Sequence, residues 1–161
     1  MTLPEYQEIT VTPGEERGWH WLVLSGPDGV TGKLSCLFNP ATGGYSHLEI
    51  EVSPRGIGLG SLLMQRFAAD IGPGKPVDGV ITNNEAKVYL AEAGYFSMAD
   101  RDGPVTLTDP GELGAIPAVR AMSACGIFIT ELSVRQHVVG AGDIRYLVSF
   151  TGVTTEPEKS E

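Results

Sequence analysis

The sequence contains few cysteines and histidines, and its basic residues are outnumbered by acidic ones. Among 161 residues there are two Cys, three His, 11 Lys and Arg, and 20 Asp and Glu. Cys36 and Cys125 lie far apart, and no group of His, Cys or carboxylate residues has the spacing of metal ligands. We therefore expect no bound metal, and two free thiols in the reducing cytoplasm.

The net charge is −9. Such a surface is unfavourable for phosphate backbones, so we expect no nucleic-acid partner and a neutral or cationic ligand instead. The alternative is that the negative charge only makes the protein more soluble and indicates nothing about its ligand. No apolar run approaches the roughly 20 residues of a membrane helix, and residues 1–10 lack the basic-then-apolar pattern of a signal peptide. We expect no membrane partner.

The first third of the chain alternates between apolar and polar residues, which is typical of β-strands. Such runs cover residues 6–12, 19–25, 30–38 and 45–52, and clusters rich in Gly, Pro, Asn and Asp separate them. The pattern predicts an antiparallel meander of four strands. The connection between the first two, residues 13–18, is too short to hold a helix.

Helical periodicity begins at residue 59. The expected elements are a helix over 59–71, a strand near 78–82, a helix over 84–93, strand material at 95–98 and 104–108, a helix within 116–126, and a closing pair of strands at 126–134 and 143–153. We expect one α/β (α+β) domain over residues 1–153 and a disordered tail over 154–161.

The junction between the fourth strand and the first helix reads Arg55-Gly56-Ile57-Gly58-Leu59-Gly60. Unpaired N–H groups and the positive end of the helix dipole meet at such a junction, and glycine lets an anion approach the backbone closely. The pattern predicts a phosphate site, with a tight turn that binds nothing as the alternative. The G-x-G-x-G spacing excludes the dinucleotide fingerprint, and "GVTGKL" (29–34) lacks the Ser or Thr of a P-loop.

"VSPRGIGLGSLL" (52–63) resembles the acyl-CoA-binding motif of the GNAT superfamily of N-acyltransferases, in which R/Q-x-x-G-x-G/A follows a strand; Arg55, Gly58 and Gly60 match it. "NNEAKVYLAEAGYF" (83–96) resembles the second motif of that family, N-x-x-A…G-F. The matching residues there are Asn83, Ala86, Gly94 and Tyr95. The resemblance covers about residues 5–108.

The resemblance implies a GNAT-like fold, with a mixed, mostly antiparallel sheet that splays between strands four and five. It implies transfer of an acyl group, expected to be acetyl, from acetyl-CoA or another acyl-CoA to a primary amine of a small molecule or peptide. The pantetheine would lie along the fourth strand, and an asparagine would reach its amide. The implied cofactor-binding residues are Ile50, Val52, Arg55, Gly56, Ile57, Gly58, Leu59, Gly60, Ser61, Asn83 and Asn84.

The catalytic residues are less clearly marked. Many family members carry a tyrosine, the acid for the leaving thiolate, four residues after the second-motif alanine, and this position is Leu90 here. Tyr89 is one residue early, about 100° away on a helix, so it is a candidate acid or a packing residue. Glu49 and Glu51 are candidate bases on the fourth strand, with solvent-facing side chains as the alternative.

The family normally inserts one or two helices between the first two strands, as a wall of the acceptor site, and this insertion is missing or reduced here. We expect residues 111–126 to pack beside the acceptor side of the open cleft, and a homodimer rather than a monomer; a helix that merely plugs a monomer's core is the alternative. A catalytically inactive CoA-binding or interaction module is the second functional hypothesis.

Overall fold

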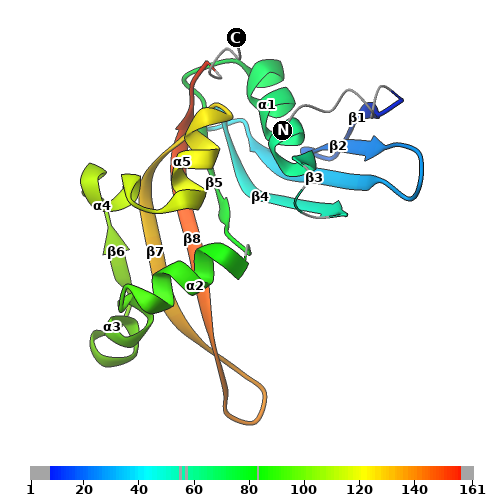
Figure 1. Cartoon of the computed structure of the whole chain (residues 1–161). Helices are drawn as coiled ribbons and strands as arrows, with labels where there is room; N and C mark the ends of the chain where they lie inside the picture. Colours follow the sequence, from blue (N-terminus) through cyan, green and yellow to red (C-terminus); the bar gives the residue numbers. More distant parts are fainter. Residues whose placement is uncertain (1–7, 55, 57, 83, 157–161) are drawn as a thin grey trace.

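The structure, a computed structural model, describes residues 8–54, 56, 58–82 and 84–156. These residues form an α+β fold with one eight-stranded sheet in the order β1-β2-β3-β4-β5-β8-β7-β6 (Figure 1). The pairing is antiparallel except between β4 and β5. The elements are β1 (Thr10–Glu16), β2 (Trp19–Ser25), β3 (Thr31–Asn39), β4 (Gly44–Ser53), α1 (Leu59–Ile71), β5 (Pro76–Val80), α2 (Asn84–Glu92), α3 (Tyr95–Asp102), β6 (Val105–Leu107), α4 (Pro110–Gly114), α5 (Pro117–Ala124), β7 (Ile127–Val139) and β8 (Asp143–Thr154).

The predicted meander forms, but its first strand ends four residues later than the sequence suggested. β1 continues through Pro13 and Gly14, which pair with Leu22 and Trp21 of β2. Proline is tolerated because β1 is an edge strand, which needs ladder hydrogen bonds on one side only. The β1–β2 connection is therefore only Arg17-Gly18, both at positive φ. No helix stands between these two strands, as expected.

β4 carries a bulge in its first half. Between the pairs Ser35↔Glu49 and Leu37↔Ser46, β3 has one intervening residue and β4 has two. His47 takes a φ of 57° there. After the bulge the expected alternation holds, because Leu48 is buried and Glu49 is exposed. The bulge thus sets which side chains of β4 face the helices.

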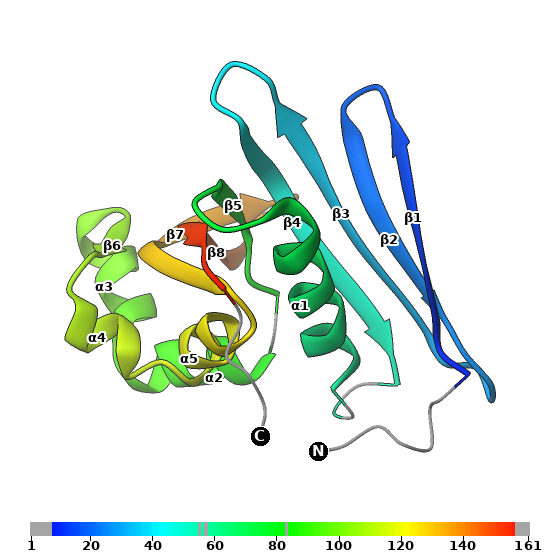
Figure 2. The same ribbon diagram turned by 90° about the horizontal axis from the view of Figure 1, so that it is seen from above.

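The helices of the described chain gather on one side of the sheet (Figure 2). α1 packs against β3 and β4, while α3, α4 and α5 pack against β7. The core between these layers includes Leu34, Leu63 and Val148, all at most 1% exposed. On the other face, Trp19 and Phe128 keep 41% and 48% of their surface exposed. Among the described residues, the helices therefore cover one face of the sheet and leave the other, the bare face, uncovered.

Two expectations on chain segments were wrong. Residues 95–98 were expected to be strand material, but they begin α3, where Ala99 is buried and Phe96 stacks on Tyr146 of β8 at 4.3 Å. Gly94, at φ 88°, makes the turn that starts this helix. A four-residue run was too short to reveal a helical period.

The tail boundary at residue 154 was set too early. Thr154 ends β8, is 1% exposed, and its hydroxyl donates to the Gly72 carbonyl at 2.6 Å and accepts from the Lys75 N–H at 2.9 Å. A buried side chain with two partners belongs to the domain.

In the described part of the chain, no helix combines the length and apolar character that crossing a membrane requires.

Candidate functional site

The two parallel strands at the centre of the sheet separate after a short contact. β4 and β5 pair at Tyr45↔Val77 and Leu48↔Gly79. A Cβ on Gly79 would lie 2.4 Å from the Leu48 carbonyl oxygen, so the close approach requires glycine. Beyond this point β5 stays with β8, since the Ile81 N–H donates to the Val148 carbonyl at 2.8 Å. The second half of β4 stays paired with β3 but has no strand on its β5 side (Figure 1).

A pocket of about 330 Å³ lies at this separation. Its walls come from β4, the loop into α1, the end of β5, β8 and α5, and its described lining residues are Leu48, Ile50, Val52, Gly56, Gly58, Leu59, Gly60, Ser61, Met64, Val80, Ile81, Thr82, Ala118, Ala121, Met122 and Phe150. None of these residues has an ionisable side chain. The pocket therefore offers an apolar channel and backbone groups, rather than acids and bases, to a ligand.

The glycines form one end of the pocket. Gly56 and Gly58 take φ values of 84° and 86°, a left-handed region that other residues rarely adopt. Gly58 is the N-cap of α1; no side chain caps it, and the first turn contains no acidic residue. The helical hydrogen bonds begin with Leu62 N–H to Gly58 O, at 3.0 Å. The N–H groups of residues 59–61 thus have no partner within the helix.

Space is open above these backbone groups. A Cβ built on Gly56, Gly58 or Gly60 meets no heavy atom within 4 Å. These glycines are therefore not packing contacts of the fold, in contrast to Gly79. Open space, unpaired N–H groups and a helix dipole together make the start of α1 suitable for an anion.

α5, which belongs to the segment 111–126 that we expected beside the cleft, forms another wall of the pocket. Ala118, Ala121 and Met122 line the pocket, and just after the helix Cys125 hydrogen-bonds with Ser61 of α1. Burial raises the pKa of the Cys125 thiol, and the Ser61 contact acts in the opposite direction. α5 therefore closes one side of the pocket that contains the glycines, from the helix side of the sheet.

The structure brings most of the predicted cofactor residues together. Ile50, Val52, Gly56 and the Gly58–Ser61 segment all line the pocket. Asn84 begins α2, but its side chain lies outside the described part. Arg55, Ile57 and Asn83 also lie outside the described residues.

The candidate catalytic residues are not gathered in this pocket. Glu49 and Glu51 are exposed and alternate with the pocket-lining Ile50 and Val52, so they lie on the bare face of the sheet. Tyr89 is half-buried and packs against the core, and it is absent from the pocket lining.

A polar cluster that the sequence did not mark lies at the bulge. The His47 imidazole Nδ1 is 3.0 Å from Ser46 Oγ, the His47 N–H donates to Asp78 at 3.3 Å, and the His47 ring lies 6.3 Å from Trp19. These residues come from β2, β4 and β5, at the point where β4 and β5 part. Tertiary pairing across three strands created this cluster, so spacing in the sequence could not have revealed it.

No group of three or more metal-ligating residues occurs within the described ranges. A scan against protein-family models, a search of curated proteins and a search of solved structures found no match to this chain.

Proposed function

We propose that this chain is an acyl-CoA-dependent N-acyltransferase with a GNAT-like fold. It would transfer an acyl group, expected to be acetyl, to a primary amine of a small molecule or peptide. The observation that supports this most is the uncapped, glycine-lined N-terminus of α1, which opens into the pocket where β4 leaves β5. The strand order and the one parallel pair also agree with the resemblance of the two sequence motifs.

The residues of the pocket fit the parts of coenzyme A. The pyrophosphate would accept hydrogen bonds from the N–H groups of residues 58–61. The pantetheine arm would lie along Ile50 and Val52, on the edge of β4 that no strand covers. The bound molecule supplies a thioester, and the chain's part is to orient it and exclude water.

The chemistry requires a neutral amine and a group that accepts its proton. Since the described pocket lining contains no ionisable side chain, we place the base outside this lining, on the bare face of the sheet. Glu49 and Glu51 are there, so the amine would approach from that side. An acidic protein of net charge −9 attracts a cationic acceptor. We expect the protein to be cytoplasmic and to form a homodimer. The exposed Trp19 and Val23 on this face would then lie in the dimer interface.

A catalytically inactive CoA-binding module is the second candidate. Leu90 stands at the usual tyrosine position and is 1% exposed, while Tyr89 packs against the core. Thiol release from acetyl-CoA, measured with a panel of amines, separates the two functions. The transferase releases thiol in an amine-dependent way, whereas the inactive module binds CoA without release.

Gly60→Glu tests the site itself. A side chain at this position meets open space, and an acidic residue in the first turn suits a helix, so the variant should fold. Its carboxylate would repel the pyrophosphate and weaken CoA binding by roughly 100-fold, or about 2.7 kcal/mol. The matched control is Gly114→Glu, which adds the same charge at an open glycine of α4. Equal CoA affinity in the two variants would refute the assignment.

A further inference from the structure

A second and larger cavity lies on the other flank of α1. Its volume is about 520 Å³, within the range of small-molecule sites. It exists because α1 covers β3 and β4 better than β2, and because no helix joins β1 to β2 to fill the space. The proposed transferase function does not use this cavity.

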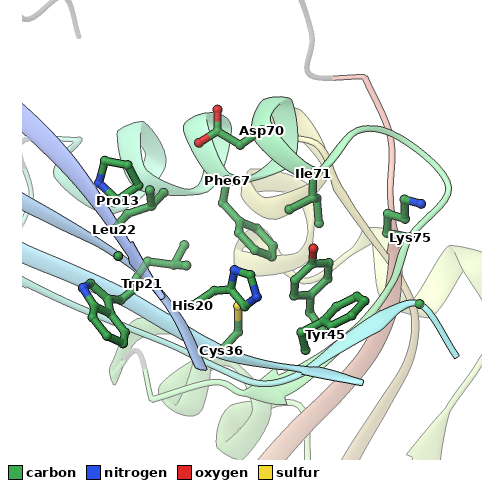
Figure 3. Close-up of a pocket in the computed structure, with 14 residues that line it drawn as sticks. Pro13, His20, Trp21, Leu22, Cys36, Tyr45, Phe67, Asp70, Ile71 and Lys75 are labelled. Carbon is green, nitrogen blue, oxygen red and sulfur yellow. The ribbon is translucent and has the colours of Figure 1, made fainter. Parts of the chain in front are cut away.

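Four aromatic rings from four different elements meet in the cavity: His20 of β2, Phe38 of β3, Tyr45 of β4 and Phe67 of α1 (Figure 3). The Tyr45 centroid lies 5.7 Å from His20, 5.2 Å from Phe38 and 5.6 Å from Phe67. The rings of His20 and Phe67 are nearly perpendicular to Tyr45, at 85° and 84°. Tilted rings turn both faces and edges toward the space between them, and ring faces attract cations.

Two carboxylates lie around the cavity. Asp70 of α1 lines it and forms an ion pair with Arg66, whose Nε lies 3.1 Å from each carboxylate oxygen. Glu15 of β1 lies 3.9 Å from His20 Nε2. Lys75 also lines the cavity, and in Figure 3 it stands to the right of Ile71 and Tyr45.

The Glu15 carboxylate acts on the Tyr45 hydroxyl. Burial raises the pKa of this hydroxyl, and the neighbouring Cys36 and Glu15 raise it further. The Cys36 thiol, with its own pKa raised to about 12, is uncharged at neutral pH, so Glu15 is the charge that disfavours an anion beside Tyr45 and favours a cation. A neutral apolar ligand would gain nothing from Glu15 or Asp70.

We propose that this cavity is a binding site for a small organic ammonium compound, with its cationic head against the sides of the His20, Tyr45 and Phe67 rings that face the cavity, and with Glu15 and Asp70 as the nearby carboxylates. The proposal does not depend on the transferase function. The site is on the opposite flank of α1 from the glycine loop, and it requires a cation rather than a phosphate.

The test compares choline with 3,3-dimethylbutan-1-ol, in which a carbon replaces the quaternary nitrogen. Choline has no N–H group to acylate, so its binding is separate from any transfer reaction. Titration followed by backbone-amide NMR should give saturable shifts at Phe38 and Tyr45, with choline bound at least roughly tenfold more tightly than the alcohol. Equal affinity of the two compounds, or no saturable shift with choline at high millimolar concentration, would overturn the proposal.

Two variants locate the site without disturbing the core. Glu15→Gln and Asp70→Asn remove charge at exposed positions, and together they should weaken choline binding about tenfold while leaving the alcohol unaffected. Glu131→Gln, an exposed carboxylate of β7, is the matched control and should bind choline as the wild type does. An unchanged affinity in the double variant would contradict the role of the two carboxylates.

Discussion

Replacing Thr154 by valine tests how much the hydrogen bonds of its side chain at the end of β8 contribute to stability. The hydroxyl bridges the Gly72 carbonyl and the Lys75 N–H, at 2.6 and 2.9 Å. Valine keeps the shape but leaves both partners unsatisfied, at a cost of about 1–3 kcal/mol for a buried group. Because both contacts are only partly buried, we expect a total loss of about 2 kcal/mol, which lowers the Tm of a domain of this size by about 4–8 °C.

Urea unfolding followed by circular dichroism measures this loss. The control is Thr151→Val, an exposed position on the same strand, where the change should stay within about 0.5 kcal/mol. A Thr154→Val protein as stable as the Thr151→Val protein would refute the reasoning. It would mean that water replaces the hydroxyl at no cost, and that residue 154 is marginal to the fold.

Three further predictions concern the sheet, a buried thiol and the candidate acid. Gly79→Ala should destabilise the protein by about 1–3 kcal/mol in urea unfolding, because the new Cβ would lie 2.4 Å from the Leu48 carbonyl oxygen; unchanged stability would show that β4 and β5 separate freely. Burial raises the pKa of Cys36 from 9.0 to about 12, so between these values the unfolded chain loses a proton that the folded chain keeps. Stability should therefore fall as pH rises through this window, by at most about 1.4 kcal/mol per pH unit from this group, and Cys36→Ala should show a shallower decline; parallel curves would contradict the burial of the thiol. Tyr89→Phe should keep most of any acyltransferase activity, because Tyr89 does not line the pocket; a loss of kcat beyond about 100-fold with intact CoA binding would identify it as the acid.

The sequence predicted the parts of the fold in which one strong local signal dominates. Alternating apolar and polar residues predicted the positions of β2, β3 and β4, and the helical periodicity predicted the position of α1. The glycines at 56, 58 and 60 gave the anion-suited helix start, since positive φ values and open backbone are properties of glycine itself.

Other features depended on the tertiary structure. Proline often ends a strand. Pro13, however, lies in the edge strand β1, where no second neighbouring strand needs the N–H that proline lacks. α5 was predicted as a helix, but nothing in its sequence indicated that Ala118 and Ala121 would face the glycine loop. The cavity beside Tyr45 is likewise made by β1, β2, β3, β4 and α1 together, and no local sequence pattern indicates it.

The alternation in β4 also separates the candidate bases from the cofactor residues. Glu49 and Glu51 alternate with Ile50 and Val52, so the two pairs point to opposite faces of β4. The same strand cannot present all four side chains to one pocket. The sequence alone therefore implied that cofactor and candidate bases lie on different sides of the sheet, with any reaction at the point where the sheet opens.

A titration of the isotopically labelled protein with coenzyme A, followed by backbone-amide NMR, tests most directly whether coenzyme A binds in the glycine-lined pocket. We expect saturable shifts that are largest for the amides of residues 58–61, with smaller shifts at Ile50 and Val52, because these groups line the pocket between β4 and β5. Shifts confined to the cavity around His20 and Tyr45, or no saturable shifts, would contradict it.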